Sequence, residues 1–199
     1  MLNKGNKNKS SIGCVIMAAG NSVRFGSNKL MTRIGELSLI EHTFNAVPRD
    51  DIDLICVVTQ YRDIEDLARS HGFSCVRNDR PEDGISLTVR LGTEFLSGDC
   101  DAIIYLVSDQ PLLRKISISG LISFYRSHPE KIIASSCNGK HGNPCIFPSR
   151  FFPELCSLTG DTGGSKVIRT HEDDLLLFEI PEEELQDIDT MDNLKTLTT

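Results

Sequence analysis

Residues 15–30 read Val-Ile-Met-Ala-Ala-Gly-Asn-Ser-Val-Arg-Phe-Gly-Ser-Asn-Lys-Leu, an apolar strand that leads into a glycine-bracketed loop. The small residues at the start of the loop allow backbone N–H groups to approach phosphate oxygens closely, and its two cations offset phosphate charge. We therefore predict that this loop holds a nucleotide. The residues predicted to contact the nucleotide here are Ala18, Ala19, Gly20, Asn21, Ser22, Arg24 and Lys29.

The spacing of this loop excludes two better-known phosphate loops. A Walker A motif needs four residues between its glycines and a lysine directly after the second, whereas five residues separate Gly20 from Gly26 and the lysine comes three positions after Gly26. The dinucleotide fingerprint Gly-x-Gly-x-x-Gly would require a glycine at Ser22. A plain glycine turn between a strand and a helix remains the alternative, although such a turn needs neither cation.

Apolar runs of strand length alternate along the chain with stretches of helical period, which predicts βαβ crossovers. The unbroken apolar run at residues 53–58 is typical of a central strand. We expect an α/β, doubly wound, Rossmann-like fold with a mainly parallel sheet and helices on both faces. The predicted strands are residues 12–17, 53–58, 74–77, 102–107, 131–135, 144–147 and 175–180.

Helix signals lie between most of these strands. Ser38 and Glu41 have capping-box spacing and open a helix that ends near Val47, before a proline. The other predicted helical faces are Ile64, Leu67 and Ala68, then Leu87, Leu91 and Phe95, then Leu121, Ile122, Phe124 and Tyr125.

The length of 199 residues predicts a single domain over residues 12–199, after a flexible basic tail at residues 1–11. The tail carries three lysines with no apolar segment after them, so we do not expect a secretory signal. No run approaches the roughly 20 apolar residues of a membrane span. The formal net charge of -7 and the absence of an aromatic-interleaved basic stripe argue against a nucleic-acid partner.

The cysteines form no Cys-x-x-Cys pair, and several lie inside predicted strands. We therefore expect reduced, mostly buried residues of a cytoplasmic protein rather than a disulfide framework or a zinc site. A reactive thiol at Cys145 is the minor alternative. The cysteines are Cys14, Cys56, Cys75, Cys100, Cys137, Cys145 and Cys156.

Acidic residues supply a candidate metal site. Asp109 follows the apolar run at residues 102–107, where a carboxylate suits Mg²⁺, because magnesium takes one or two protein carboxylates and completes its shell with phosphate and water. A turn aspartate before Pro111 is the alternative. Near the other end, Asp187 and Asp189 point the same way if their segment is extended, so either is a candidate second ligand.

Three further features are expected to face the same cleft, because ligands bind beyond the carboxyl ends of the strands in open α/β sheets. Residues 78–92 place small and hydroxyl-bearing side chains at a helix start, which suits a nucleotide contact or a simple helix cap. Residues 141–144 either bind the second substrate or form a plain turn. Residues 159–166 combine glycines with a lysine at a predicted helix start, which suits another phosphate or a plain loop. The site residues drawn from these segments are Asn78, Gly84 and Ser86 for the nucleotide, and Gly142, Asn143, Pro144, Asp161, Gly163 and Lys166 for the second substrate.

Taken together, these motifs resemble the molybdenum cofactor cytidylyltransferase branch of the nucleotidyltransferases. The resemblance runs from about residue 12 to residue 194. The loop after the first strand marks the superfamily, and the Asp109-Gln-Pro111 and Asp187-Ile-Asp-Thr190 motifs narrow it. Ser108 departs from the pattern, since a glycine commonly precedes the aspartate, and Gly35-Glu-Leu-Ser38 replaces a frequent Gly-Lys-Pro.

The resemblance implies transfer of a nucleotide from CTP, or from GTP, to the terminal phosphate of molybdopterin or its molybdenum-loaded form, with release of pyrophosphate. It implies that Asp109 and Asp189 hold Mg²⁺, that Lys29, Arg24 and Asp109 are catalytic, and that a molybdoenzyme receives the product. Ser108 would join the nucleotide-binding residues. Two alternatives stay open, namely a nucleotidyltransferase acting on a sugar or polyol phosphate and a non-catalytic nucleotide-binding chaperone.

Overall fold

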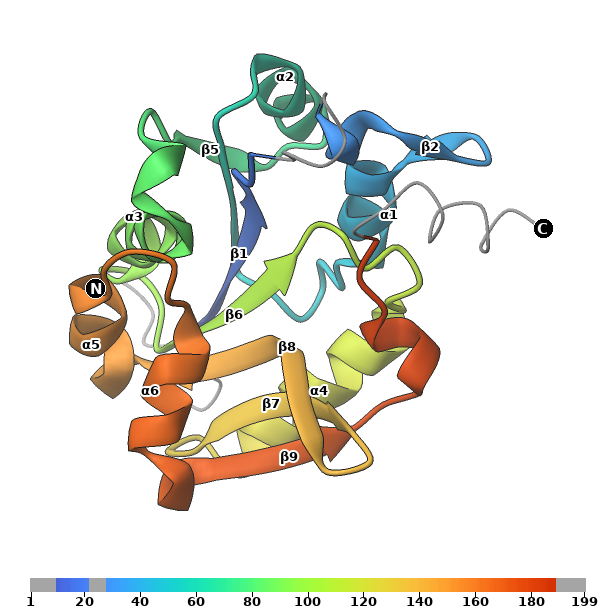
Figure 1. Cartoon of the computed structure of the whole chain (residues 1–199). Helices are drawn as coiled ribbons and strands as arrows, with labels where there is room; N and C mark the ends of the chain where they lie inside the picture. Colours follow the sequence, from blue (N-terminus) through green and yellow to red (C-terminus); the bar gives the residue numbers. More distant parts are fainter. Residues whose placement is uncertain (1–9, 22–27, 189–199) are drawn as a thin grey trace, which may run out of the picture.

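The computed structural model describes residues 10–21 and 28–188, and over these residues the chain forms a seven-stranded sheet in the order β5-β4-β1-β6-β8-β7-β9 (Figure 1). All neighbouring strands run parallel except at β8, which is antiparallel to both β6 and β7. The strands are β1 Ile12–Ala18, β4 Leu54–Thr59, β5 Ser74–Arg77, β6 Ala102–Val107, β7 Ile132–Cys137, β8 Lys140–Pro148 and β9 Leu175–Glu179. Each predicted strand is confirmed with small changes at its ends, except that the strand predicted at 144–147 is the longer β8.

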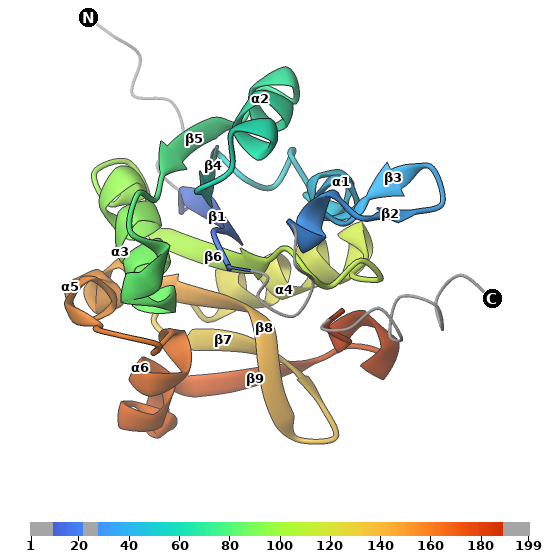
Figure 2. The same cartoon turned by 45° about the horizontal axis from the view of Figure 1, so that its top comes forward.

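Helices cover both faces of the sheet, which confirms the doubly wound α/β prediction (Figures 1 and 2). Helices α1, α2 and α4 pack on one face, and α3, α5 and α6 on the other. The helices are α1 Leu39–Ala46, α2 Arg62–Ser70, α3 Ile85–Leu96, α4 Lys115–Ser127, α5 Phe152–Ser157 and α6 Gly164–Thr170. Short 3-10 helices are η1 Lys29–Met31, η2 Pro81–Asp83, η3 Ser149–Phe151, η4 Glu172–Asp174 and η5 Glu182–Leu185.

Strand β1 is an interior strand of the sheet, between β4 and β6, and both of its faces are apolar. Cys14 and Ile16 pack into the cluster under α1, α2 and α4, whereas Val15 packs into the cluster under α3, α5 and α6. None of these three side chains is exposed. An apolar run without alternation therefore produced a strand buried on both faces, as expected for a parallel sheet.

The predicted capping box of α1 is present. The Glu41 carboxylate accepts hydrogen bonds from the backbone N–H of Ser38 at 2.7 Å and from its hydroxyl at 2.5 Å. These bonds lower the pKa of Glu41. Helix α1 ends at Ala46, two residues before the proline.

The prediction of which α3 side chains face the sheet is wrong in part. Leu87 is buried, but Phe95 is 47% exposed. A Cβ at Gly92 would lie 2.6 Å from Cγ1 of Val15, so the helix backbone lies almost directly on β1 at this point. Such a close approach favours a face of small residues, and Gly92 and Thr93 therefore face the sheet in place of Phe95.

Residues 141–144 are neither a turn nor the approach to a short strand, because they lie inside β8. The reversal of the chain comes earlier, at Asn138 and Gly139, whose φ angles are 52° and 75°. The register shifts between Ala134 and Ser135 of β7, so residues 143–144 of β8 lie where the ladder is interrupted. A proline is tolerated there because no ladder hydrogen bond is required of it.

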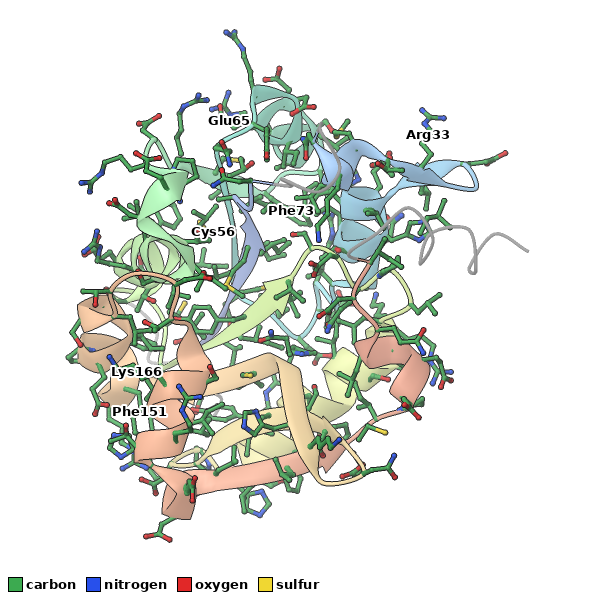
Figure 3. All side chains as sticks on the ribbon, in the orientation of Figure 1. Arg33, Cys56, Glu65, Phe73, Phe151 and Lys166 are labelled. Carbon is green, nitrogen blue, oxygen red and sulfur yellow. The ribbon has the colours of Figure 1, made fainter. Side chains whose placement is uncertain are left out.

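A two-stranded hairpin, β2 Arg33–Ile34 and β3 Leu37–Ser38, was not predicted. It projects beside α1, and Figure 3 shows Arg33 extending away from the body of the protein. The strands are two residues long, which is too short for an alternating pattern to be recognised. No helix within the described ranges has both the length and the apolar character needed to cross a bilayer.

Candidate active site

The turn after β1 lies where three parallel strands end. Its described part, residues 18–21, begins buried at Ala18 and becomes exposed at Gly20 and Asn21. The hydroxyl of Thr59, the last residue of β4, donates to the Ala18 carbonyl at 2.9 Å. Ser22 and Arg24 lie outside the described residues, so the roles predicted for them stay predictions.

Lys29 and Asp109 meet at this edge of the sheet. The Nζ atom of Lys29 lies 2.9 Å from Oδ2 of Asp109, and their side chains are 15% and 23% exposed. Lys29 is the first residue of η1, and the Asn28 side chain caps that helix by accepting from the N–H of Leu30 at 3.2 Å. The cation and the carboxylate predicted from distant parts of the sequence are therefore direct neighbours.

The segment 184–188 is tied to the loop between β6 and α4. The N–H of Ile188 donates to the Asp109 carbonyl at 2.9 Å, and the Ile188 carbonyl accepts from Nζ of Lys29 at 3.1 Å. The Gln110 amide donates to the carbonyl of Leu185 at 3.3 Å and to Oδ1 of Asp187 at 2.9 Å. These contacts bring the second acidic motif beside the first. Asp189 itself lies outside the described residues.

An ion pair between the buried Glu184 carboxylate and Arg114, whose side chain is 57% exposed, adds a further connection. Glu184 is fully buried, and its carboxylate accepts from the N–H of Arg114 at 2.9 Å and from its Nε at 2.6 Å. A buried carboxylate is stable only when it is paired and hydrogen-bonded in this way. The sequence analysis did not single out Glu184 or Gln110, although Gln110 stands in the Asp109-Gln-Pro111 motif.

The residues at this edge fit Mg²⁺ in its usual protein setting. Asp109 and Asp187 offer carboxylate oxygens, which are hard donors, and among the described residues no three acidic, histidine or cysteine side chains form a closed cage. Magnesium bound through one or two carboxylates and substrate phosphates does not need such a cage. Because Lys29 and Gln110 already contact these carboxylates, the metal would share them with those partners.

The residues predicted to contact the nucleotide near α3 and β6 are each held by hydrogen bonds to neighbouring residues. Asn78 is buried, and its side chain donates to the Thr88 hydroxyl at 3.2 Å and accepts from the N–H of Arg80 at 3.0 Å. The N–H of Ser86 donates to the Gly160 carbonyl at 3.3 Å. Ser108, at the end of β6, donates to the Met17 carbonyl at 2.8 Å. These contacts fix the conformation of the segments around the start of α3 and the end of β6. Nucleotide contact by the same residues stays a prediction.

The fold requires a glycine at position 84, where the chain passes close to residue 160. The φ of Gly84 is +85°, and a Cβ there would lie 2.5 Å from the carbonyl carbon and oxygen of Gly160. We expect Gly84→Ala to lower the free energy of unfolding by about 1–3 kcal/mol, because strain and overlap with backbone cannot relax by a rotamer change. Denaturant unfolding measures this loss.

Gly98→Ala is the matched control for Gly84→Ala. A Cβ at Gly98 meets nothing within 4 Å, and its φ is not positive. The control should be neutral or more stable by up to about 1 kcal/mol, because alanine reduces the entropy of the unfolded chain. Equal stability of the two variants would contradict the role given to Gly84.

A cavity of about 420 Å³ opens between β8, α3 and α6. Of the residues predicted for the second substrate, Gly142, Asn143, Asp161 and Gly163 line it, whereas Pro144 and Lys166 do not. Lys166 is exposed on α6, and Figure 3 shows it on the side of the molecule where α5 lies. Four of the six residues predicted to bind the second substrate therefore line one cavity.

The wall of the cavity is mainly apolar, with polar groups among its other lining residues. Met17 of β1, whose carbonyl accepts a hydrogen bond from Ser108, also lines the cavity, which therefore borders the end of β1. Such a lining suits a flat ring with a few polar substituents. The apolar and aromatic lining residues are Met17, Ile85, Val89, Tyr105, Cys145, Phe147, Leu155 and Ile168, and the polar side chains are His141, Asn143, Asp161 and Ser165.

All seven cysteines lie in the described ranges and are free, as predicted. Burial raises the pKa of the Cys145 thiol to about 12. Its Sγ donates to the Gly142 carbonyl at 3.2 Å. Because the thiolate is the reactive form, the structure argues against a reactive thiol at this position.

We expect Cys145 to resist iodoacetamide at pH 8, where only about one thiol in 10⁴ is ionised at that pKa. The half-buried Cys137 and Cys156 should be alkylated first. Peptide mass spectrometry over a time course measures the order, and unfolding in guanidinium should make all seven sites react. Labelling of Cys145 as fast as Cys137 in the folded protein would contradict the burial argument.

Two residues that the sequence analysis missed contact the turn directly. Gln60 and Tyr61 follow β4, and their side chains hydrogen-bond to residues 19–21. The signal that could have found them is their position, because the end of β4 lies at the same edge as the end of β1. Polar residues just beyond a parallel strand are candidates for the ligand site.

Comparison with known proteins identifies the domain. The family model described as the MobA-like NTP transferase domain matches residues 14–175. Purine catabolism protein PucB of Bacillus subtilis is 28% identical over 169 residues, which cover 78% of this chain and 80% of PucB.

Two solved structures share the fold. Rv0371c of Mycobacterium tuberculosis, in complex with manganese, has a TM-score of 0.77 at 18% identity and covers 95% of this chain and 98% of its own. The 4-diphosphocytidyl-2C-methyl-D-erythritol synthase of Anaerococcus prevotii has a TM-score of 0.76 at 15% identity, with 95% of each chain covered.

Proposed function

The chain belongs to the MobA-like NTP transferase domain family, and from this premise we propose that it transfers CMP from CTP to the terminal phosphate of molybdopterin or of its molybdenum-loaded form. Pyrophosphate is the second product. The observation that carries the proposal is the pair of Lys29 and Asp109, which meet beside the turn after β1 and near a cavity lined by the predicted acceptor residues.

Lys29 has the position and charge to act on the reacting phosphates. In the proposed reaction an acceptor phosphate oxygen attacks the α-phosphorus in line, and no covalent enzyme intermediate forms. Because that oxygen is already ionised, the reaction needs no general base. The chain therefore contributes positioning and charge stabilisation, and we assign to Lys29 and Arg24 the role of offsetting charge on the α-phosphate and the departing pyrophosphate.

Asp109 and Asp189 are the residues that would hold Mg²⁺. A divalent cation there would neutralise phosphate charge and orient the triphosphate. The manganese in the structure of the mycobacterial relative supports a divalent metal in this fold. The contact of Ile188 with the Asp109 backbone supports the choice of Asp189, because Asp189 is the next residue in the chain.

The cavity supports a heterocyclic acceptor over a sugar or polyol phosphate. A polyol would need a dense set of hydrogen-bonding groups, whereas most of the cavity wall is apolar or aromatic. Tyr105 and Phe147 lie edge to face with their ring centroids 5.8 Å apart, and they give the wall a rigid aromatic part. We assign the acceptor to this cavity, with Gly142, Asn143 and Asp161 at its polar side.

CTP is the proposed donor because the motifs resemble the cytidylyltransferase branch. The name of the Anaerococcus relative, a diphosphocytidyl synthase, supports the same base. A molybdoenzyme is the proposed recipient of the product. Because all seven thiols are free, the protein is expected to work in the reducing cytoplasm.

The deciding experiment incubates the full chain with molybdopterin, Mg²⁺ and each of the four nucleoside triphosphates in turn. Release of pyrophosphate and formation of molybdopterin cytosine dinucleotide with CTP would support the proposal. A parallel series offers sugar and polyol phosphates as acceptors. Product formation only in that series would overturn the molybdopterin assignment, and product formation only with GTP would overturn the base.

A further inference from the structure

Two side chains beyond β4 bind consecutive carbonyls of the turn after β1. The Gln60 amide nitrogen donates to the Ala19 carbonyl and to Oδ1 of Asn21, both at 2.9 Å. The Tyr61 hydroxyl donates to the Gly20 carbonyl at 2.8 Å. Both partners of the Gln60 nitrogen are oxygens, so the orientation of this amide is fixed by its neighbours.

These bonds determine where the N–H groups of the turn point. In a trans peptide the carbonyl of one residue and the N–H of the next point in opposite directions. Because Gln60 holds the Ala19 carbonyl, the N–H of Gly20 points away from Gln60. Because Tyr61 holds the Gly20 carbonyl, the N–H of Asn21 points away from Tyr61. Neither N–H donates to another residue within the described parts of the chain.

Successive backbone N–H groups without a protein partner are donors that an anion can use. The hydroxyl of the fully buried Thr59 likewise donates to the Ala18 carbonyl, so the carbonyls of residues 18, 19 and 20 each accept a hydrogen bond from a side chain. Gln60 and Tyr61 are only half-buried. The Gln60 and Tyr61 side chains bind the carbonyls of a surface turn and add little to the packing of the core. Their role is therefore best explained by a ligand of the turn.

We infer that Gln60 and Tyr61 are positioning residues for the nucleotide, which hold the carbonyls of residues 19–20 so that the N–H groups of Gly20 and Asn21 face the triphosphate. The inference rests on the proposed function, because it assumes that the turn binds a nucleoside triphosphate. It adds two residues that touch the turn and not the reacting atoms.

The first test compares Tyr61→Phe with Tyr125→Phe. Each substitution removes one phenolic hydroxyl that donates to a backbone carbonyl, since the Tyr125 hydroxyl donates to the Pro129 carbonyl at 2.9 Å. Tyr125 lies in the buried core on α4, and Tyr61 is half-buried. If hydroxyl loss acted only through stability, Tyr125→Phe would have the larger effect on every measurement.

Binding of magnesium-CTP is measured by titration calorimetry for the wild type and both variants, together with kcat, KM and the melting temperature. Tyr61→Phe should raise Kd and KM for CTP about 3- to 10-fold and leave kcat within about twofold, because one positioning hydrogen bond is lost. Tyr125→Phe should leave Kd unchanged and lower the melting temperature more. Equal Kd values in the two variants would overturn the inference.

The second test replaces Gln60 by glutamate, which has the same shape but no amide hydrogens. The carboxylate would oppose the two oxygens that Gln60 now contacts, so we expect CTP binding to weaken about 10-fold or more. Gln60→Met removes the donor without adding charge and should give a smaller loss in the same direction. Unchanged Kd in both variants would overturn the inference.

The same titrations separate the inference from the proposed function. A wild-type protein that binds neither CTP nor GTP defeats the proposed function. A wild-type protein that binds CTP, with Tyr61→Phe and Gln60→Glu binding it as well as the wild type, defeats only the positioning role.

Discussion

Lys29→Ala is expected to lower kcat for pyrophosphate release by about 10²- to 10³-fold, which is the loss seen when one preorganised donor is removed from a transition state. The Lys29 ammonium lies at the carboxyl edge of the sheet, beside Asp109 and the turn after β1. Charge builds on the phosphates as pyrophosphate departs, and alanine cannot offset it. A coupled pyrophosphate assay under saturating CTP measures the effect.

Two further variants make this result specific. Lys29→Arg keeps the charge but replaces a compact ammonium by a planar fork, so partial activity is expected. Lys115→Ala removes an exposed lysine at the start of α4. The Lys115 side chain makes no hydrogen bond or ion pair to another described residue, so this variant should leave kcat unchanged. Near wild-type turnover in folded Lys29→Ala would remove Lys29 from the reaction. The fold should survive, because a partly exposed ion pair contributes only about 1 kcal/mol.

The fold could be predicted from the sequence because its main signals are local. In residues 12–17 and 102–107, the side chains that pack against the helices are apolar or aromatic. Runs of this kind form parallel strands that are buried on both faces. The Ser38 and Glu41 capping box marks a helix start by contacts between residues three apart. Signals of this kind do not depend on how the rest of the chain folds.

The predictions that were wrong or missing concern features that depend on packing between distant parts of the chain. Which face of α3 turns inward depends on the contact between Gly92 and Val15, residues that are far apart in the chain. Leu87 and Phe95 have the spacing of a helical stripe, yet only Leu87 is buried. The antiparallel direction of β8 likewise depends on the two-residue reversal at 138–139, which the strand pattern alone does not determine.

The meeting of Asp109 and Lys29 at one edge of the sheet could be predicted from the sequence, because Asp109 follows β6, Lys29 lies in the segment after β1, and parallel strands bring such residues to one side. Their roles in catalysis and metal binding stay predictions. Their direct ion pair was not predicted, because side-chain contact requires coordinates. Glu184 was missed for the same reason, since a glutamate in an acidic run looks exposed until its contact with Arg114 is seen.

Asp109→Asn is expected to reduce metal-dependent turnover by about 10²-fold or more, because the amide keeps the shape of the side chain and loses the charge that a hard divalent cation requires. The backbone of Asp109 also accepts from the N–H of Ile188, and this bond does not depend on the side chain. The variant should therefore fold, with the 184–188 segment still attached, which circular dichroism and the melting temperature can check.

Titration with metal separates a metal ligand from a structural aspartate. If Asp109 holds Mg²⁺, Asp109→Asn should need a higher concentration of Mg²⁺ or Mn²⁺ for half-maximal activity, and chelator should abolish the remaining turnover. Asp66→Asn is the control, since Asp66 is exposed on α2 and its side chain makes no hydrogen bond or ion pair within the described chain. Full activity of Asp109→Asn at the wild-type metal requirement would show that the carboxylate serves only to pair Lys29, and the assignment of Mg²⁺ to this edge of the sheet would then be wrong.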